Sequence, residues 1–210
     1  MEAFKNNFKS LIETVVANND IHAKWLNTLS MMENTGARKI SKFEHPVLTD
    51  IVILKHAAEE ARHAYYLKKQ ISKLAAESPD YSFPYLLSPM ESYHYLHSLD
   101  VLVSRYLKTE RKMEGREMMF GAYLLVTYAI EVRADMLYGI YQDVLANAGS
   151  KVNVKSIIAE EEGHLAEMNR MLKEFSTDWE VMAKDVLEIE DKLFVTWVKA
   201  LQNELSVTAA

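Results

Sequence analysis

Residues 58–63 read AEEARH, and a close copy lies 101 positions further on, where residues 159–164 read AEEEGH. Each copy contains the pattern Glu-x-x-His. Residues three apart on an α-helix lie on one face, one turn from each other. Glu60 with His63, and Glu161 with His164, can therefore reach the same metal ion. The repeat predicts two helices that each present a carboxylate and an imidazole to a shared centre.

Each motif has a matching glutamate on the helix before it. Glu33 precedes Glu60 by 27 residues, and Glu131 precedes Glu161 by 30 residues. In an antiparallel hairpin, residues at equal height lie equally far from the turn. The midpoint of the first pair falls at Pro46, and that of the second falls beside an Asn-Ala-Gly-Ser turn signal. The spacing predicts two antiparallel hairpins with their ligands roughly 20 Å from each turn.

Composition favours helices throughout the chain. Nearly half of the 210 residues are hydrophobic, and there are only 6 Gly and 4 Pro, so helix breakers are few. We expect one domain over residues 1–210, an all-α four-helix bundle with an extra connecting helix and an extra C-terminal helix. The bundle core should span about 20–175. The expected helices cover about 3–43 with a break near Asn18–Asp20, 46–77, 90–109, 114–147, 152–175 and 178–205.

Local signals suggest where these helices begin and end. Asp20 is a plausible N-cap after the break, Pro46 fits a first turn, and Gly149 fits a C-terminal cap. Thr177 or Asp178 could cap the last helix. That helix carries an apolar stripe at helical spacing, which predicts either packing within the chain or the surface of a homodimer.

Charge and cysteine content narrow the functional classes. The formal net charge is −6 and there is no long basic run, so we expect no nucleic-acid binding. Without cysteine, disulfides, iron–sulfur clusters and thiolate zinc sites are excluded. The first residues lack the apolar core of a signal peptide, and no apolar run approaches the ~20 residues of a membrane span. A soluble cytoplasmic protein is the expectation.

Glu33 stands out among the candidate ligands of the first hairpin. It is the only acid between Asp20 and Glu44, and apolar residues share its face. Four carboxylates inside an apolar bundle would be very costly without compensating positive charge. Two divalent metal ions would supply that charge.

The order Glu, Glu-x-x-His, Glu, Glu-x-x-His resembles the ferritin-like di-iron carboxylate superfamily over about residues 20–175. The resemblance implies six ligands, which would also be the catalytic groups: Glu33, Glu60, His63, Glu131, Glu161 and His164. The two motif glutamates would bridge both ions, each remaining glutamate would bind one ion, and each histidine would bind one ion by a ring nitrogen. This donor set suits two iron ions or a manganese–iron pair.

The resemblance implies an oxidoreductase that activates O₂ or peroxide, specifically an oxygenase acting on a small organic substrate. Gly36 and Ala37, just beyond Glu33, could leave room for that substrate. Electrons would come from an external donor, because the chain has no cysteine ligands and no nucleotide-binding glycine motif. Two alternatives are a ferritin-like ferroxidase or iron-storage protein and a tRNA-modifying hydroxylase. The acidic net charge disfavours the latter.

Several neighbouring residues stay open between two interpretations. His56 shares a helix face with Glu60 and His63. It could be a third imidazole ligand, or it could be a histidine that contacts a ligand side chain or packs in the core. Asp135 could accept a hydrogen bond from the ring N–H of a ligand histidine, or it could be an exposed aspartate. Tyr128 could be a redox relay, although core packing is favoured. The remaining acids of the two motifs are expected to be surface charges: Glu59, Glu160 and Glu162. Glu59 could pair with Arg62 or Lys55.

Overall fold

The computed structural model describes residues 2–44, 47–74 and 79–208, and within these ranges the chain forms helices and no strand. The expected all-α class is confirmed. The elements are α1 (Glu2–Val16), α2 (Asn19–Phe43), α3 (Ile51–Ile71), the short 3₁₀ helix η1 (Phe83–Tyr85), α4 (Pro89–Thr109), α5 (Gly115–Asn147), α6 (Lys155–Phe175) and α7 (Trp179–Thr208).

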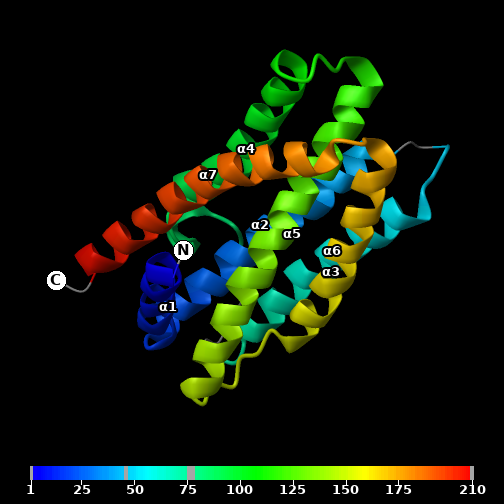
Figure 1. The fold of residues 1–210 in the computed structure, drawn as a ribbon. Coiled ribbons are helices and arrows are strands. Elements are labelled where there is room, and N and C mark those ends of the chain that lie inside the picture. Colours follow the sequence, from blue (N-terminus) through cyan, green and yellow to red (C-terminus); the bar gives the residue numbers. More distant parts are fainter. Residues whose placement is uncertain (1, 45–46, 75–78, 209–210) are drawn as a thin grey trace.

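Two helix pairs form the centre of the molecule. Helix α2 packs along α3, and α5 packs along α6, so that each Glu-x-x-His helix lies beside the helix that precedes it (Figure 1). Helix α4, the expected connecting helix, packs against α5 and α7, and α7 crosses over α5. The result is a helical bundle to which α1, α4 and α7 are added.

The break in the first helical stretch lies where the sequence predicts it, but its cap is different. Helix α2 begins after Asn18, whose side-chain oxygen accepts hydrogen bonds from the backbone N–H of Asp20 and Ile21 at 2.9 and 3.2 Å. Asp20 lies in the first turn of α2 instead, where a carboxylate is favoured by the helix dipole. The N-cap is therefore Asn18 and not Asp20.

Helix α3 is shorter than expected. It begins at Ile51, because the Asp50 carboxylate accepts the N–H of Val52 at 2.8 Å and caps the helix. It ends at Ile71, and the following residues to Leu74 form turns. The expected start at Pro46 lies outside the described residues, and so does the expected end at Glu77.

The second hairpin turn follows the predicted cap. Gly149 has a positive φ of 60°, and the N–H of Ser150 returns to the carbonyl of Leu145 at 3.0 Å. Helix α6 then begins at Lys155, three residues later than about 152. The N–H of Val154 is held by the side chain of Gln142 at 2.8 Å, which keeps this residue outside the helix.

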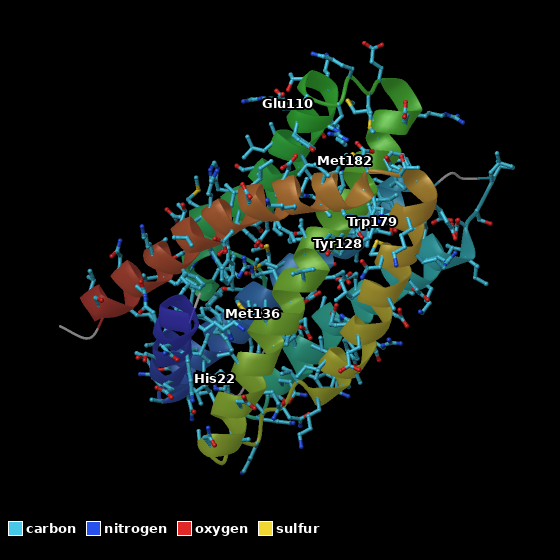
Figure 2. The ribbon with its side chains drawn as sticks, viewed as in Figure 1. His22, Glu110, Tyr128, Met136, Trp179 and Met182 are labelled. Carbon is cyan, nitrogen blue, oxygen red and sulfur yellow. The ribbon has the colours of Figure 1, made fainter. Side chains whose placement is uncertain are left out.

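The apolar stripe of α7 is covered by its own chain. Four of its members, Met182, Val186, Trp197 and Leu201, are at most 1 % exposed, so these side chains pack inside the bundle. Tyr128 and Trp179 pack against the apolar cluster that includes Met182, near the crossing of α5 and α7 (Figure 2). Tyr128 is thus a core-packing residue.

A buried ion pair fixes α7 to the bundle. Glu190 on α7 is 1 % exposed. Arg133 on α5 donates from Nε and Nη2 to its two oxygens at 2.9 and 2.6 Å, and the Tyr95 hydroxyl on α4 donates to Oε1 at 2.6 Å. The Arg133 guanidinium also lies 4.0 Å from the centre of the Phe194 ring. Three helices are joined at this one carboxylate.

None of the helices in the described ranges combines the length and the apolar composition that crossing a bilayer would require.

We expect Glu190→Ala to lower the free energy of unfolding by about 3 kcal/mol, because it leaves the Arg133 charge buried without its main partner. The exposed neighbour Glu188 gives a matched control, since Glu188→Ala should change stability by no more than about 0.5 kcal/mol. Urea unfolding followed by circular dichroism measures both. Equal, small losses in the two variants would show that the pair does not anchor α7.

Candidate metal centre

The six predicted ligands meet in the interior between α2, α3, α5 and α6. Five of them are buried, and the side chain of Glu33 is 13 % exposed. Glu33 comes from α2 and Glu131 from α5, while the two motifs come from α3 and α6. The group consists of Glu33, Glu60, His63, Glu131, Glu161 and His164.

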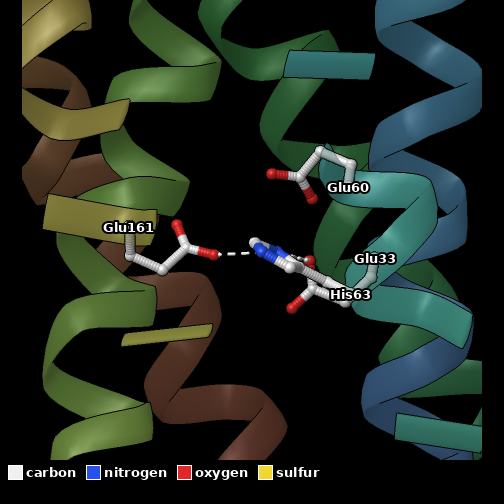
Figure 3. A group of neighbouring side chains, drawn as sticks. All are labelled: Glu33, Glu60, His63 and Glu161. Carbon is white, nitrogen blue, oxygen red and sulfur yellow. Dashed lines mark ion pairs between the residues drawn. The ribbon is translucent and has the colours of Figure 1, made fainter. Parts of the chain in front are cut away.

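These side chains form two overlapping groups of possible metal ligands. One ligand atom from each member lies within 4.8 Å of the others in each group. The first group contains Glu33 and His63, and the second contains Glu131 and His164; Glu60 and Glu161 belong to both. Figure 3 shows the first group, in which Glu161 reaches across from α6 to face His63 on α3. The buried clusters could hold metal ions at two adjacent positions.

The donor atoms that face the centre lack hydrogen-bond partners. His63 Nδ1 lies 3.1 Å from Glu161 Oε1, and His164 Nδ1 lies 3.5 Å from Glu161 Oε2, but neither nitrogen makes a hydrogen bond. Glu161 Oε2 is also buried and unpartnered. Buried polar atoms without partners are rare and costly. A cation at the centre would satisfy all three atoms, so the residues fit a metal site.

The pKa values of the metal-free centre show the same need for positive charge. Burial and the neighbouring carboxylates raise the pKa values of Glu60 and Glu131 well above the usual range. Burial alone would lower the pKa of His164, but the facing carboxylates of Glu131 and Glu161 raise it to about 11. In the absence of metal, protons take the place of the missing positive charge.

The outer nitrogens of the two histidines are held in a crossed arrangement. His63 on α3 is paired through Nε2 with Glu160 on α6 at 2.8 Å, and His164 on α6 is paired through Nε2 with Glu59 on α3 at 2.7 Å. A carboxylate on Nε2 places the proton there and leaves Nδ1 free for a metal. Each helix thus orients the histidine of the other helix.

Two cations cover these outer carboxylates. Arg62 donates a hydrogen bond to Glu160, and its Nη2 lies 3.6 Å from Glu59 Oε1. Lys55 Nζ lies 3.9 Å from Glu59 Oε2. The expected partners of Glu59 are therefore present. The interpretation of Glu59 and Glu160 as mere surface charges is wrong, because each also contacts a buried histidine. Glu162 is exposed, as predicted.

The two additional candidates lie apart from the ligand groups. His56 is buried, but its Nε2 is paired with Glu167 at 2.7 Å, and it belongs to neither ligand group. Its ring centre lies 4.8 Å from that of His164, so it packs beside the centre. Asp135 is exposed, and Glu59 and Glu160 occupy the role considered for it.

A cavity of about 400 Å³ adjoins the centre. Glu33, Glu60 and Glu131 form part of its wall, and most of the remaining wall is apolar. Gly36 lines it beside Glu60, and a Cβ at this position would lie 3.4 Å from Glu60 Oε2, in ordinary van der Waals contact. Ala37 is buried but is not part of the wall.

Tyr138 is a residue of the site that the sequence did not single out for a role. Its hydroxyl donates a hydrogen bond to Glu33 Oε1, and its side chain is 2 % exposed and lines the cavity. Its position seven residues after Glu131, on the same helical face, was the available signal. For Glu59 and Glu160 the signal was the repeat itself, since both occupy the same place in it.

We find no protein-family model, no curated protein and no solved structure that matches this chain.

We expect the metal-free protein to lose stability as the pH rises from about 6.5 to about 11. Folded His164 keeps its proton up to about pH 11, whereas the unfolded side chain releases it near 6.5. The folded state therefore binds more protons in this window, and its free energy of unfolding falls as pH rises. His164→Asn should flatten this slope in denaturant titrations, and the exposed control His97→Asn should not. An equally steep slope in His164→Asn would contradict this account.

We expect Glu59→Ala and Glu160→Ala each to weaken metal binding about 10- to 100-fold, because each removes the partner of one ligand histidine. The exposed Glu162→Ala is the matched control and should bind metal as the unaltered protein does. Competition with a coloured chelator measures the affinities. Unchanged affinity in both variants would mean that the crossed pairs do not orient the histidines.

Proposed function

We propose that this protein is a ferritin-like di-iron carboxylate oxidoreductase that activates O₂ or peroxide and acts on a small organic substrate. The observation that carries the proposal is that two overlapping ligand groups lie directly beside a mainly apolar cavity. Both ligand groups share Glu60 and Glu161, and the cavity wall includes Glu33, Glu60 and Glu131. A substrate in the cavity would lie directly against the metal ligands.

The residues divide naturally between two ions. Glu60 and Glu161 would bridge them, since they are the members common to both groups. Glu33 with His63 would complete one position, and the remaining pair, Glu131 with His164, would complete the other. A pair of reduced iron ions in an oxygen-rich site supplies electrons to O₂ or peroxide.

The surrounding residues support this chemistry in defined ways. The Tyr138 hydroxyl donates to Glu33 and fixes the orientation of that carboxylate. Apolar walls keep bulk water away from a reactive centre. The chain itself contains no cysteine and no nucleotide-binding glycine motif, so a separate protein would deliver the electrons.

Iron storage is the competing function. A storage subunit needs a route for ions and a cage, whereas the space beside this centre is mostly apolar. That difference favours a substrate over a stream of metal ions. The proposal therefore places iron as a resident cofactor rather than as cargo.

The experiment is anaerobic reconstitution with Fe²⁺, followed by metal analysis and by O₂ consumption with a chemical reductant. We expect two ions per chain, and O₂ uptake that continues over many turnovers. Glu60→Ala and Glu161→Ala should each bind less than one ion per chain and consume O₂ at least about 100-fold more slowly, because both positions lose a shared ligand. Glu162→Ala is the control and should match the unaltered protein.

Two outcomes would contradict the proposal. Less than one ion per chain after reconstitution would remove the metal centre. Uptake of many ions per chain together with a large closed assembly on a sizing column would identify iron storage instead.

A further inference from the structure

The cavity extends along the helices, because residues several turns apart on two of them line its wall. Along α2 its wall extends from Leu29 to Phe43, and along α5 it extends from Met119 to Tyr138. At a rise of 1.5 Å per residue, the 14 steps from Leu29 to Phe43 along α2 span roughly 21 Å. A volume of about 400 Å³ spread over this length suits a slender molecule.

The metal ligands face the side of this cavity rather than its end. Glu33 lies four residues from Leu29 and ten residues from Phe43, or roughly 6 and 15 Å along the helix. The cavity therefore has a short arm on one side of the ligands and a long arm on the other. A molecule that fills it would present an interior part of its length to the centre.

The short arm is closed by buried side chains from four helices. Each of them is at most 5 % exposed. Trp197 stacks on Tyr95 at a ring distance of 5.8 Å, and the Tyr95 hydroxyl and Arg133 are both bound to Glu190. The floor of this arm therefore offers a ligand mainly apolar surface: Leu29, Tyr95, Leu137, Phe194 and Trp197.

The long arm opens to solvent and carries positive charge. Lys42 and Met119 are exposed at its end. Beside them Lys39 forms an ion pair with Asp100 at 2.5 Å, with side chains 29 % and 40 % exposed. Lys42 forms no ion pair with any residue in the described ranges. Lys39, Lys42 and Asp100 are the charged residues in the wall of this arm, so the wall there carries one more positive than negative charge.

The long arm also holds an unused hydrogen-bond donor. Tyr123 lines the arm and stacks on Phe43 at 4.6 Å between ring centres. Its hydroxyl is buried and has no hydrogen-bond partner. Polar atoms of a ligand thus find partners in the long arm, while the floor of the short arm is mainly apolar.

We infer that the cavity binds an unbranched, mainly aliphatic carboxylic acid. Its apolar end lies on the Trp197 floor, and its carboxylate lies at the opening near Lys39 and Lys42. Glu33, Glu60 and Glu131 then face carbon atoms in the interior of the chain. The binding mode stands on the cavity alone, whereas the identification of this acid as a substrate rests on the proposed function.

The test uses metal-free protein and three probes that share one tail: dodecanoate, dodecan-1-ol and dodecylamine. Tryptophan fluorescence reports binding, because Trp197 lies in the cavity wall and stacks on Trp25, and calorimetry gives the affinities. Dodecanoate should bind at least about fivefold more tightly than the alcohol, and the amine should bind most weakly, as expected for a partly exposed charge pair.

Two pairs of variants test separately how the carboxylate head and the aliphatic tail of the ligand are bound. Lys42→Glu should abolish the preference for dodecanoate over dodecylamine. The control Lys199→Glu makes the same charge change at an exposed site on α7 away from the cavity, and this variant should retain the preference. Ala134→Phe, which narrows the short arm, should weaken binding of hexadecanoate at least about tenfold more than that of octanoate. Ala146→Phe, exposed on the same helix, should leave both affinities unchanged.

The inference is overturned if the acid and the amine bind equally, or if Lys199→Glu has the same effect as Lys42→Glu. It is also overturned if Ala134→Phe weakens both acids equally. These results are independent of the iron experiment. A protein that binds two ions and consumes O₂ but ignores dodecanoate loses only this inference, and one that binds dodecanoate but no iron loses only the proposed function.

Discussion

The need for positive charge between Glu60 and Glu161 is the constraint on which the rest of the centre depends. Four carboxylates lie in a helical interior with few cations, and the raised pKa values of Glu60 and Glu131 show how costly a negative charge is there. Lys55 and Arg62 stay at the surface and neutralise only the outer acids. The interior therefore remains short of positive charge unless a metal or protons provide it. The unpartnered Nδ1 atoms are donors that a metal ion could use.

Much of this centre follows from the sequence because helical geometry is local. Glu60 and His63 lie on one face whatever surrounds them, and a turn signal at the midpoint fixes which glutamate of the neighbouring helix is level with them. The all-α class and the break before α2 follow from similarly local rules. The sequence also places the cap of α5 at Gly149.

Other features depend on how helices approach one another, and the sequence did not predict them. Glu59 and Glu160 look like solvent-facing residues on an isolated helix, but α3 and α6 face each other across the centre and bring both within reach of a histidine. The cavity is a further case, because its floor requires α7 to place Phe194 and Trp197 against α2 and α5. Caps such as Asn18 and Asp50 are local, but they compete with equally suitable neighbours.

The crossed histidine pairs have a consequence for how such a centre can change. They resemble an isologous contact, because each half of the chain supplies a carboxylate to the histidine of the other half. Replacing Glu59 alters the basicity of a histidine in the opposite half of the chain, and replacing Glu160 does the reverse. The carboxylate that orients each ligand histidine therefore comes from the opposite half of the chain. A substitution in either motif would thus act on the histidine of the other motif, although the two motifs lie 101 residues apart in the sequence.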